Sequence, residues 1–147
     1  MMTVKKNSIF PANRNEVFQQ LQKIETLQFV AAPFASFKPV NDEQALVWEE
    51  GTEASFYFKL FSFIPFAVHT IKIEKFDENS GIVSKESNRY VPVWNHHISL
   101  GYIDEQHTEY TDIVEIEAGW QTIFVYLWAC CFYSHRQRKW IKLLTHS

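Results

Sequence analysis

The chain has 147 residues, a length typical of one domain that buries its own core, and we expect a single domain over residues 1–147. Hydrophobic residues make up 46% of the sequence and aromatic residues 16%, with 13 phenylalanines. This composition predicts a thick aromatic core or a wide apolar cavity. The net charge of -3 gives no overall attraction to nucleic acid or to an anionic membrane, so we expect neither as a partner.

Cysteine usage and hydrophobic patterning predict a cytoplasmic protein. The two cysteines, Cys130 and Cys131, are adjacent, and adjacent cysteines rarely form a disulfide because the geometry strains the backbone. A chain without a disulfide framework is typical of a reducing compartment. Residues 1–10 lack the apolar centre of a signal peptide. The longest apolar stretch, residues 120–133, is shorter than the roughly 20 residues that span a bilayer, so we predict a buried helix there.

The beginning of the chain predicts a strand followed by two short helices. Residues 2–10 carry apolar side chains among polar ones, as a strand does. Asn13, followed three residues later by Glu16, is similar to a capping box and predicts the start of a helix. Residues 26–34 predict a second short helix or turn, which Pro33 breaks.

From residue 35 the sequence changes to short runs rich in β-branched and aromatic residues, and turn residues separate several of them. This spacing is typical of an antiparallel meander. The predicted strands are residues 36–40, 45–50, 54–61, 67–76, 81–87, 93–102 and 108–118.

Residues 120–144 predict one long helix with a basic C-terminal half. A curved antiparallel sheet has one face to cover, and only this helix is long enough to cover most of it. The sequence therefore predicts an α+β fold, with a curved antiparallel sheet of about seven strands wrapped around a long C-terminal helix and two short helices after the first strand. Residues 123–133 are apolar on nearly every side of the helix, so we expect either a homodimer contact or the two short helices to cover the remainder.

Local sequence supports this arrangement in three places, which are SIFPANRNEVFQQLQKIETL (8–27), LFSFIPFAVHTIKIEKFD (60–77), and YTDIVEIEAGWQTIF with FYSHRQRKW within 110–140. They resemble the opening strand and helix, a hairpin, and the last strand and closing helix of the helix-grip superfamily. That superfamily includes START domains, the birch pollen allergen family and polyketide cyclase/dehydrase-like bacterial proteins. The resemblance implies the helix-grip fold for nearly the whole chain. It implies no catalytic residues, because these proteins share no catalytic motif.

His96 and His97 lie side by side in the predicted strand 93–102, and neighbouring side chains of a strand point to opposite faces. The residues that share a face with His96 form the larger and more apolar set, which is Trp94, Ile98, Leu100 and Tyr102. We therefore expect His96 to face the helix and His97 to face outward. This alternation argues against a site built from both histidines.

The same alternation places His69 and Asp112 on inward faces of their strands. An ionised carboxylate in an apolar interior costs several kcal/mol unless it has a partner, and a histidine on a neighbouring strand is a natural one. We therefore predict a contact between His96 and Asp112, joined by an arginine of the last helix. The spacing leaves open whether Arg136 or Arg138 faces the interior.

Three uses of such a contact stay open. It is a structural cluster of buried polar groups, or it orients the polar group of a bound apolar molecule, or His96 acts as a general base while Asp112 holds its tautomer. No spacing such as HExxH or CxxC predicts a metal site, and no motif predicts a cofactor.

We expect the protein to bind a small hydrophobic or aromatic molecule between the sheet and the C-terminal helix, with aromatic walls and a few polar contacts. The predicted ligand contacts are His69, His96, Asp112, Trp48, Phe56, Phe58, Trp94, Tyr110, Phe124, Leu127, Cys131 and Arg138. We expect both cysteines to be inert, as thiols in an apolar helix are.

Two alternatives remain. One is an enzyme of the cyclase, dehydrase or isomerase type with His96 as the base, and the other is an interaction or structural domain without a ligand. A cavity on the order of a few hundred cubic ångströms favours binding or catalysis, and a solid core favours the interaction domain.

Overall fold

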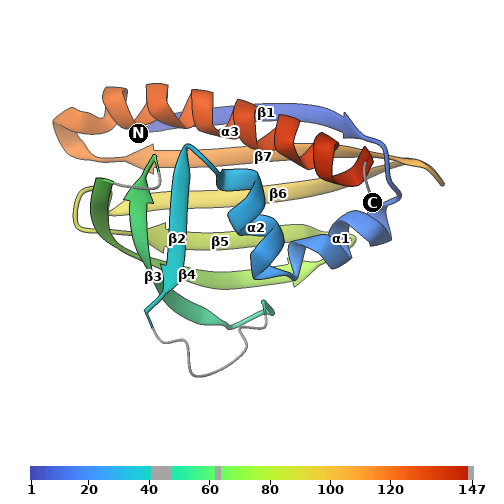
Figure 1. Ribbon diagram of the computed structural model, residues 1–147, viewed down its shortest axis with the longest axis horizontal. Coiled ribbons are helices and arrows are strands. Elements are labelled where there is room, and N and C mark those ends of the chain that lie inside the picture. Colours follow the sequence, from blue (N-terminus) through green and yellow to red (C-terminus); the bar gives the residue numbers. More distant parts are fainter. Residues whose placement is uncertain (41–47, 62–63, 146–147) are drawn as a thin grey trace.

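The computed structural model describes residues 1–40, 48–61 and 64–145 (Figure 1). One antiparallel sheet runs through them in the strand order β1-β7-β6-β5-β4-β3-β2. Each strand pairs with its neighbour in sequence except β1, which pairs with β7. The strands are β1 (Met2–Phe10), β2 (Ala35–Pro39), β3 (Glu53–Leu60), β4 (Ile64–Asp77), β5 (Gly81–Ser87), β6 (Val93–Asp104) and β7 (His107–Glu117).

The helices lie on one face of this sheet. The long helix α3 (Thr122–Thr145), preceded by the short 3-10 turn η1 (Gly119–Gln121), packs along β1 and β7, and α1 (Arg14–Leu21) and α2 (Ile24–Ala31) lie over the remaining strands (Figure 1). The side chain of Asn13 accepts a hydrogen bond from the backbone N–H of Glu16 at 2.9 Å, as the capping pattern predicts. The predicted fold class is confirmed. None of the helices in the described ranges is long and apolar enough to cross a membrane.

The structure describes only half of one predicted strand, residues 45–50. Residues 45–47 lie outside the described residues, and residues 48–50 form a loop and turn in place of the predicted strand. Trp48 nevertheless turns inward, and its ring stacks on that of Phe56 with a centroid separation of 5.8 Å. Among the described residues, the packing of Trp48 on Phe56 thus holds its ring in the interior from a loop position.

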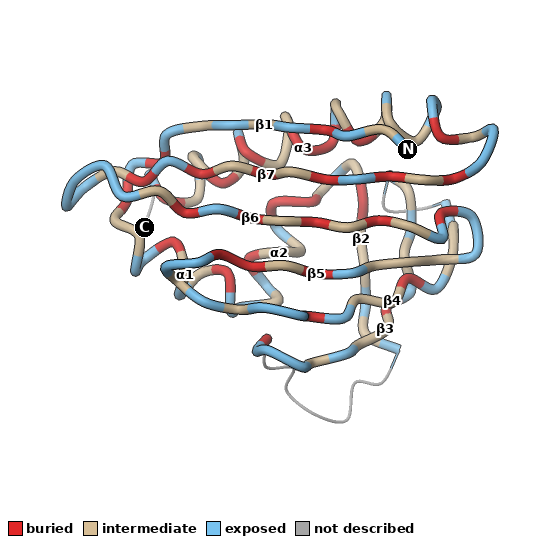
Figure 2. Tube along the Cα trace, turned by 180° about the vertical axis from the view of Figure 1, so that it is seen from behind, coloured by how far each residue is buried: buried red, intermediate tan, exposed pale blue. Residues whose placement is uncertain are grey.

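Burial alternates along β6 and β7, as Figure 2 shows from the outer side of the sheet. His96 is buried on the helix-facing side, whereas His97 is only partly buried on the other side, so the predicted orientation of both histidines is confirmed. Tyr102 was expected to share the inner face, but it is exposed. The register of β6 and β7 shifts between Tyr102 and Asp104, next to their hairpin, and the alternation ends there.

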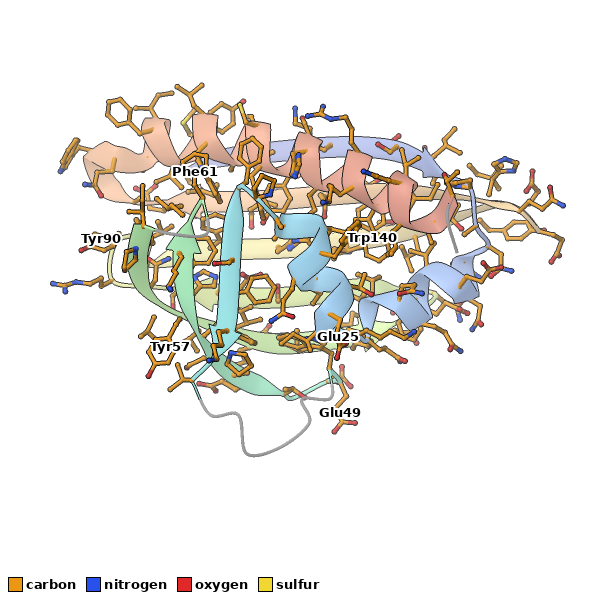
Figure 3. All side chains as sticks on the ribbon, viewed as in Figure 1. Glu25, Glu49, Tyr57, Phe61, Tyr90 and Trp140 are labelled. Atoms are coloured by element: carbon orange, nitrogen blue, oxygen red, sulfur yellow. The ribbon has the colours of Figure 1, made fainter. Side chains whose placement is uncertain are left out.

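Under α3 the core combines aromatic rings with aliphatic side chains. Trp140, labelled in Figure 3, is fully buried, and its ring centroid lies 5.6 Å from that of Phe10 and 5.9 Å from that of Tyr110. Toward the other end of α3, Trp94, Phe132 and their neighbours form a second cluster. These two clusters fix the helix on the sheet at both ends of the space between them.

Four predicted ligand contacts are wrong, because these residues lie on the outward side of α3. Phe124 and Leu127 are 63% and 55% exposed, and Cys131 and Arg138 are exposed as well. These positions share one stripe of the helix because they recur at intervals of three, four and seven residues. The short helix α2 packs against a different side of α3, so it leaves this stripe open. The expectation of a buried thiol is therefore wrong for Cys131, whereas its inertness and the homodimer contact stay predictions.

Candidate functional site

A cavity of about 110 Å³ lies between the sheet and the three helices, with Leu21 of α1, Leu27 of α2 and Phe132 of α3 in its wall. Six of the predicted contact residues line it, and these are Trp48, Phe56, Phe58, His69, Trp94 and His96. The volume is smaller than a few hundred cubic ångströms, but it is close to the roughly 150 Å³ apolar cavity that is known to hold benzene. The interior is neither solid nor wide, and its size suits a single ring.

The predicted contact between His96 and Asp112 is present. His96 Nε2 donates to Asp112 Oδ1 at 2.6 Å across β6 and β7. Asp112 is fully buried and lies behind His96, outside the cavity wall. Its carboxylate also accepts from Tyr110 Oη at 3.3 Å and from Gln137 Nε2 at 3.0 Å. Three donors of the described residues thus compensate this buried negative charge.

Burial raises the pKa of Asp112, but the interactions with His96, Arg136 and Gln137 together hold the pKa below its ordinary value of 3.8. Asp112 is therefore ionised at neutral pH. Tyr110, which was expected to touch the ligand, instead stacks on Phe10 away from the cavity, with a centroid separation of 4.4 Å. Its role is to support Asp112, because both side chains share the inner face of β7.

A second carboxylate, Glu86 of β5, was missed in the sequence. Its Oε1 accepts from His69 Nε2 at 2.8 Å, and its Oε2 accepts from Ser84 Oγ at 2.7 Å. On the other side of the same ring, Asn88 Nδ2 lies 3.1 Å from His69 Nδ1, within hydrogen-bond distance. Burial raises the pKa of Glu86, but the hydrogen bond from His69 and the charges of His69 and His96 hold it below 4.5.

His96 joins the two carboxylates into one network. The Nδ1 atom of His96 lies 3.8 Å from Glu86 Oε2, which is too long for a hydrogen bond but close enough for a strong charge interaction. Ser84 stands directly opposite His96 in the register of β5 and β6, and this pairing brings the second carboxylate to the cavity. The wall of the cavity thus carries polar groups from three adjacent strands.

The arginine that faces the cavity is Arg136, not Arg138. It lies one helical turn after Tyr133, on the same side of α3, and its Cζ is 5.7 Å from the centroid of the Tyr133 ring. Burial opposes the charge on Arg136, but surrounding groups, with Asp112 and Glu86 among them, raise its pKa. Arg136 therefore supplies a fixed positive charge beside two carboxylates.

These groups do not form a recognisable metal site. Among the described residues, no cluster of three or more His, Cys, Asp or Glu side chains is arranged to hold a metal ion. The arrangement suits two other tasks, which are to hold a polar atom of an otherwise apolar molecule and to move a proton at His96.

Neither a scan of protein-family models nor a search of curated proteins finds a match for the sequence. Solved structures do match. Protein CV1439 from Chromobacterium violaceum is 11% identical with a TM-score of 0.74, and the match covers 98% of each chain. A START superfamily protein from Mycobacterium smegmatis is 7% identical with a TM-score of 0.71, covering 98% of this chain and 97% of that one. Ara h 8.0201, a Bet v 1-like protein, is 12% identical with a TM-score of 0.71, covering 99% of both.

The chain has the helix-grip fold. At these identities the likeness shows the helix-grip fold alone, and it confirms the resemblance at that level. The ligand and the chemistry of this helix-grip domain have to be argued from its own side chains.

Proposed function

We propose that the protein binds a small hydrophobic or aromatic molecule in the cavity between the sheet and α3. The observation that carries this proposal is the combination of an aromatic wall with a buried charged network at the same cavity. Rings such as those of Phe56, Phe58 and Trp94 offer apolar contact area, and the polar groups offer the few directed contacts that fix orientation.

The free-energy cost of burying this charged network supports a functional role for it. Two ionised carboxylates in a largely buried site cost several kcal/mol to desolvate before their partners compensate. A domain that needed only stability would fill this space with apolar side chains, because such replacements are often neutral or stabilising. The network lies at the cavity wall, where the charge can also serve a ligand.

The proposal is tested by binding of isopropylbenzene, a single-ring apolar probe, followed by tryptophan fluorescence. Two tryptophans, Trp48 and Trp94, line the cavity and should report occupancy. The variant Ile98→Phe fills the cavity and should abolish binding, at a cost in stability of about 1–3 kcal/mol. The control Ile9→Phe adds the same volume at an exposed position of β1 and should bind as the wild type does. Equal binding by both variants would contradict the proposal.

A second candidate function is acid–base catalysis in the same cavity. The observation that favours it is that Asp112 holds His96 from behind, while the His96 ring itself faces the cavity. A carboxylate that orients a histidine in this way is a usual arrangement for a general base. His96→Ala should abolish turnover in a catalyst, whereas in a carrier it should weaken affinity by about 1–3 kcal/mol.

A further inference from the structure

The polar groups of the cavity are not balanced between donors and acceptors. The carboxylate oxygens of Glu86 and Asp112 each accept at least one hydrogen bond from the protein. By contrast, Arg136 Nε is buried without an acceptor among the described residues. Trp48 Nε1 is a second donor in the wall with no partner in the described ranges. Unpaired donors of the described residues therefore remain at the cavity, whereas both carboxylates already have donors of their own.

Tyr133 adds a third donor. Its hydroxyl oxygen accepts from Trp94 Nε1 at 3.0 Å, and within the described part of the chain its own hydrogen has no acceptor. Burial, followed by the charge of Glu86, raises the pKa of Tyr133 far above its ordinary value of 10.0, so the hydroxyl keeps its proton. Tyr133 and Arg136 both line the cavity from adjacent turns of α3. The cavity wall on α3 thus contains two residues that each carry a donor left unpaired by the described residues.

The charges set a second limit on the ligand. The site holds two carboxylates and one guanidinium, and it has no other permanent cation among its wall residues. A carboxylate on the ligand would add a third negative charge to a largely buried site. An uncharged acceptor adds no net charge to the buried site, so it is favoured over an anion.

On the basis of the proposed function, we propose that the ligand is an uncharged molecule of about one ring in size, whose carbonyl-type oxygen accepts hydrogen bonds from Tyr133 and Arg136. Buried donors left without partners are costly, and an oxygen at this position would satisfy both of them at once. The ring of the ligand packs against the aromatic side chains of the cavity wall. A ligand oxygen placed toward Trp48 would satisfy the third donor.

The test uses three probes of nearly the same shape, which are acetophenone, isopropylbenzene and benzoate. They carry a neutral carbonyl, no oxygen and a carboxylate, respectively. Affinities are measured by NMR titration of the wild-type protein, with the indole N–H signals of the tryptophans as reporters. We expect acetophenone to bind about tenfold more tightly than isopropylbenzene, because isopropylbenzene has no acceptor for the donors. We also expect it to bind more tightly than benzoate at pH 7, because benzoate adds a negative charge.

Two variants locate the effect. Tyr133→Phe removes only the hydroxyl and should reduce the preference for acetophenone over isopropylbenzene toward unity, while isopropylbenzene affinity changes less than about twofold. Arg136→Met should act in the same direction. The controls Tyr126→Phe and Arg138→Met lie outside the cavity wall and should keep the wild-type preference. Each preference is a ratio within one protein, so a general loss of stability does not imitate the effect.

The outcomes separate the two proposals. Equal wild-type affinities for acetophenone and isopropylbenzene would overturn the ligand class and leave the proposed function standing. Tightest binding of benzoate would overturn the uncharged ligand. A preference that Tyr133→Phe keeps in full would overturn the assigned donors. Binding of none of the three probes would overturn both the proposed function and this inference.

Discussion

At the scale of single residues, the contact between His96 and Asp112 is the clearest link between sequence and site. Both side chains point inward because of strand alternation, and they meet at 2.6 Å because β6 and β7 are neighbours. The surface pair of His107 and Asp104 has a similar distance, 2.9 Å, but both of its members are exposed. Burial is therefore what distinguishes the two pairs.

This contrast predicts different responses to the same substitution. Asp112→Asn should lower the free energy of unfolding by roughly 3–5 kcal/mol, because it removes the charge that compensates the buried polar groups around it. Asp104→Asn should change the denaturation midpoint very little, because water screens that pair. Urea denaturation of both variants measures the difference. Similar midpoints for the two variants would contradict the assigned burial and ionisation of Asp112.

The buried carboxylates also predict a pH dependence. The folded pKa of Asp112 lies below 3.8 and that of Glu86 below 4.5. A carboxylate with a lowered pKa contributes stability that is present above its unfolded pKa and is lost as the pH falls through its folded pKa. The destabilisation by Asp112→Asn should therefore be constant from about pH 5 to 7 and should shrink below about pH 4. A difference that stays the same down to pH 2.5 would contradict a lowered pKa.

At the scale of elements, the turn between β4 and β5 shows how local geometry aligns β5, the strand that carries Glu86. Gly81 has a φ of 101°, and a Cβ there would lie 2.6 Å from the carbonyl oxygen of Ile98 on β6. Only glycine fits this place without moving the backbone. The turn thus helps to fix the register of β5, and with it the position of Glu86.

Two glycines with positive φ allow a matched test of this role. Gly81→Ala should lower the free energy of unfolding by more than the roughly 1–3 kcal/mol expected for backbone strain alone, because the new methyl group also clashes. Gly51→Ala meets only the strain, since its φ is 89° and no atom of the described residues lies within 4 Å of the added Cβ. Thermal unfolding of the two variants compares them. An equal loss for both would show that close approach at Gly81 does not matter.

The elements also explain what the sequence could not predict. On β6 and β7 one face is far more apolar than the other, so alternation was enough to orient His96 and Asp112. On β5, Ile82 shares a face with Ser84 and Glu86, while Val83 lies on the other face, so neither face stands out. The sequence signal for Glu86 is its two-residue spacing from Ser84, which places both side chains on one face of β5. This signal points to the site only when the pairing of Ser84 with His96 is known.

The side of α3 that faces the sheet was even harder to predict. Its first half is apolar on nearly all sides, so spacing alone could not decide which stripe faces the sheet. A rotation of the helix about its axis exchanges Cys131 and Arg138 for Tyr133 and Arg136. Tertiary packing of Trp140 and Phe132 against the sheet fixes this rotation, and the local sequence pattern does not predict such packing.

At the scale of the whole molecule, the fold places a small hollow where aromatic walls meet a charged network. The two core clusters hold α3 at its ends, and the space between them stays open beside β5 and β6. A molecule that binds the folded chain in this hollow of about 110 Å³, and does not bind the unfolded chain, stabilises the fold. Such binding is the central claim for the protein.

The most direct test is native mass spectrometry of the protein purified from its own host. The account predicts, beside the mass of the bare chain, a species heavier by one small molecule, which dissociates on collisional activation. The same species should be missing from Ile98→Phe, where the hollow is filled. Wild-type protein that carries no added mass, or an adduct that Ile98→Phe retains in full, would contradict it.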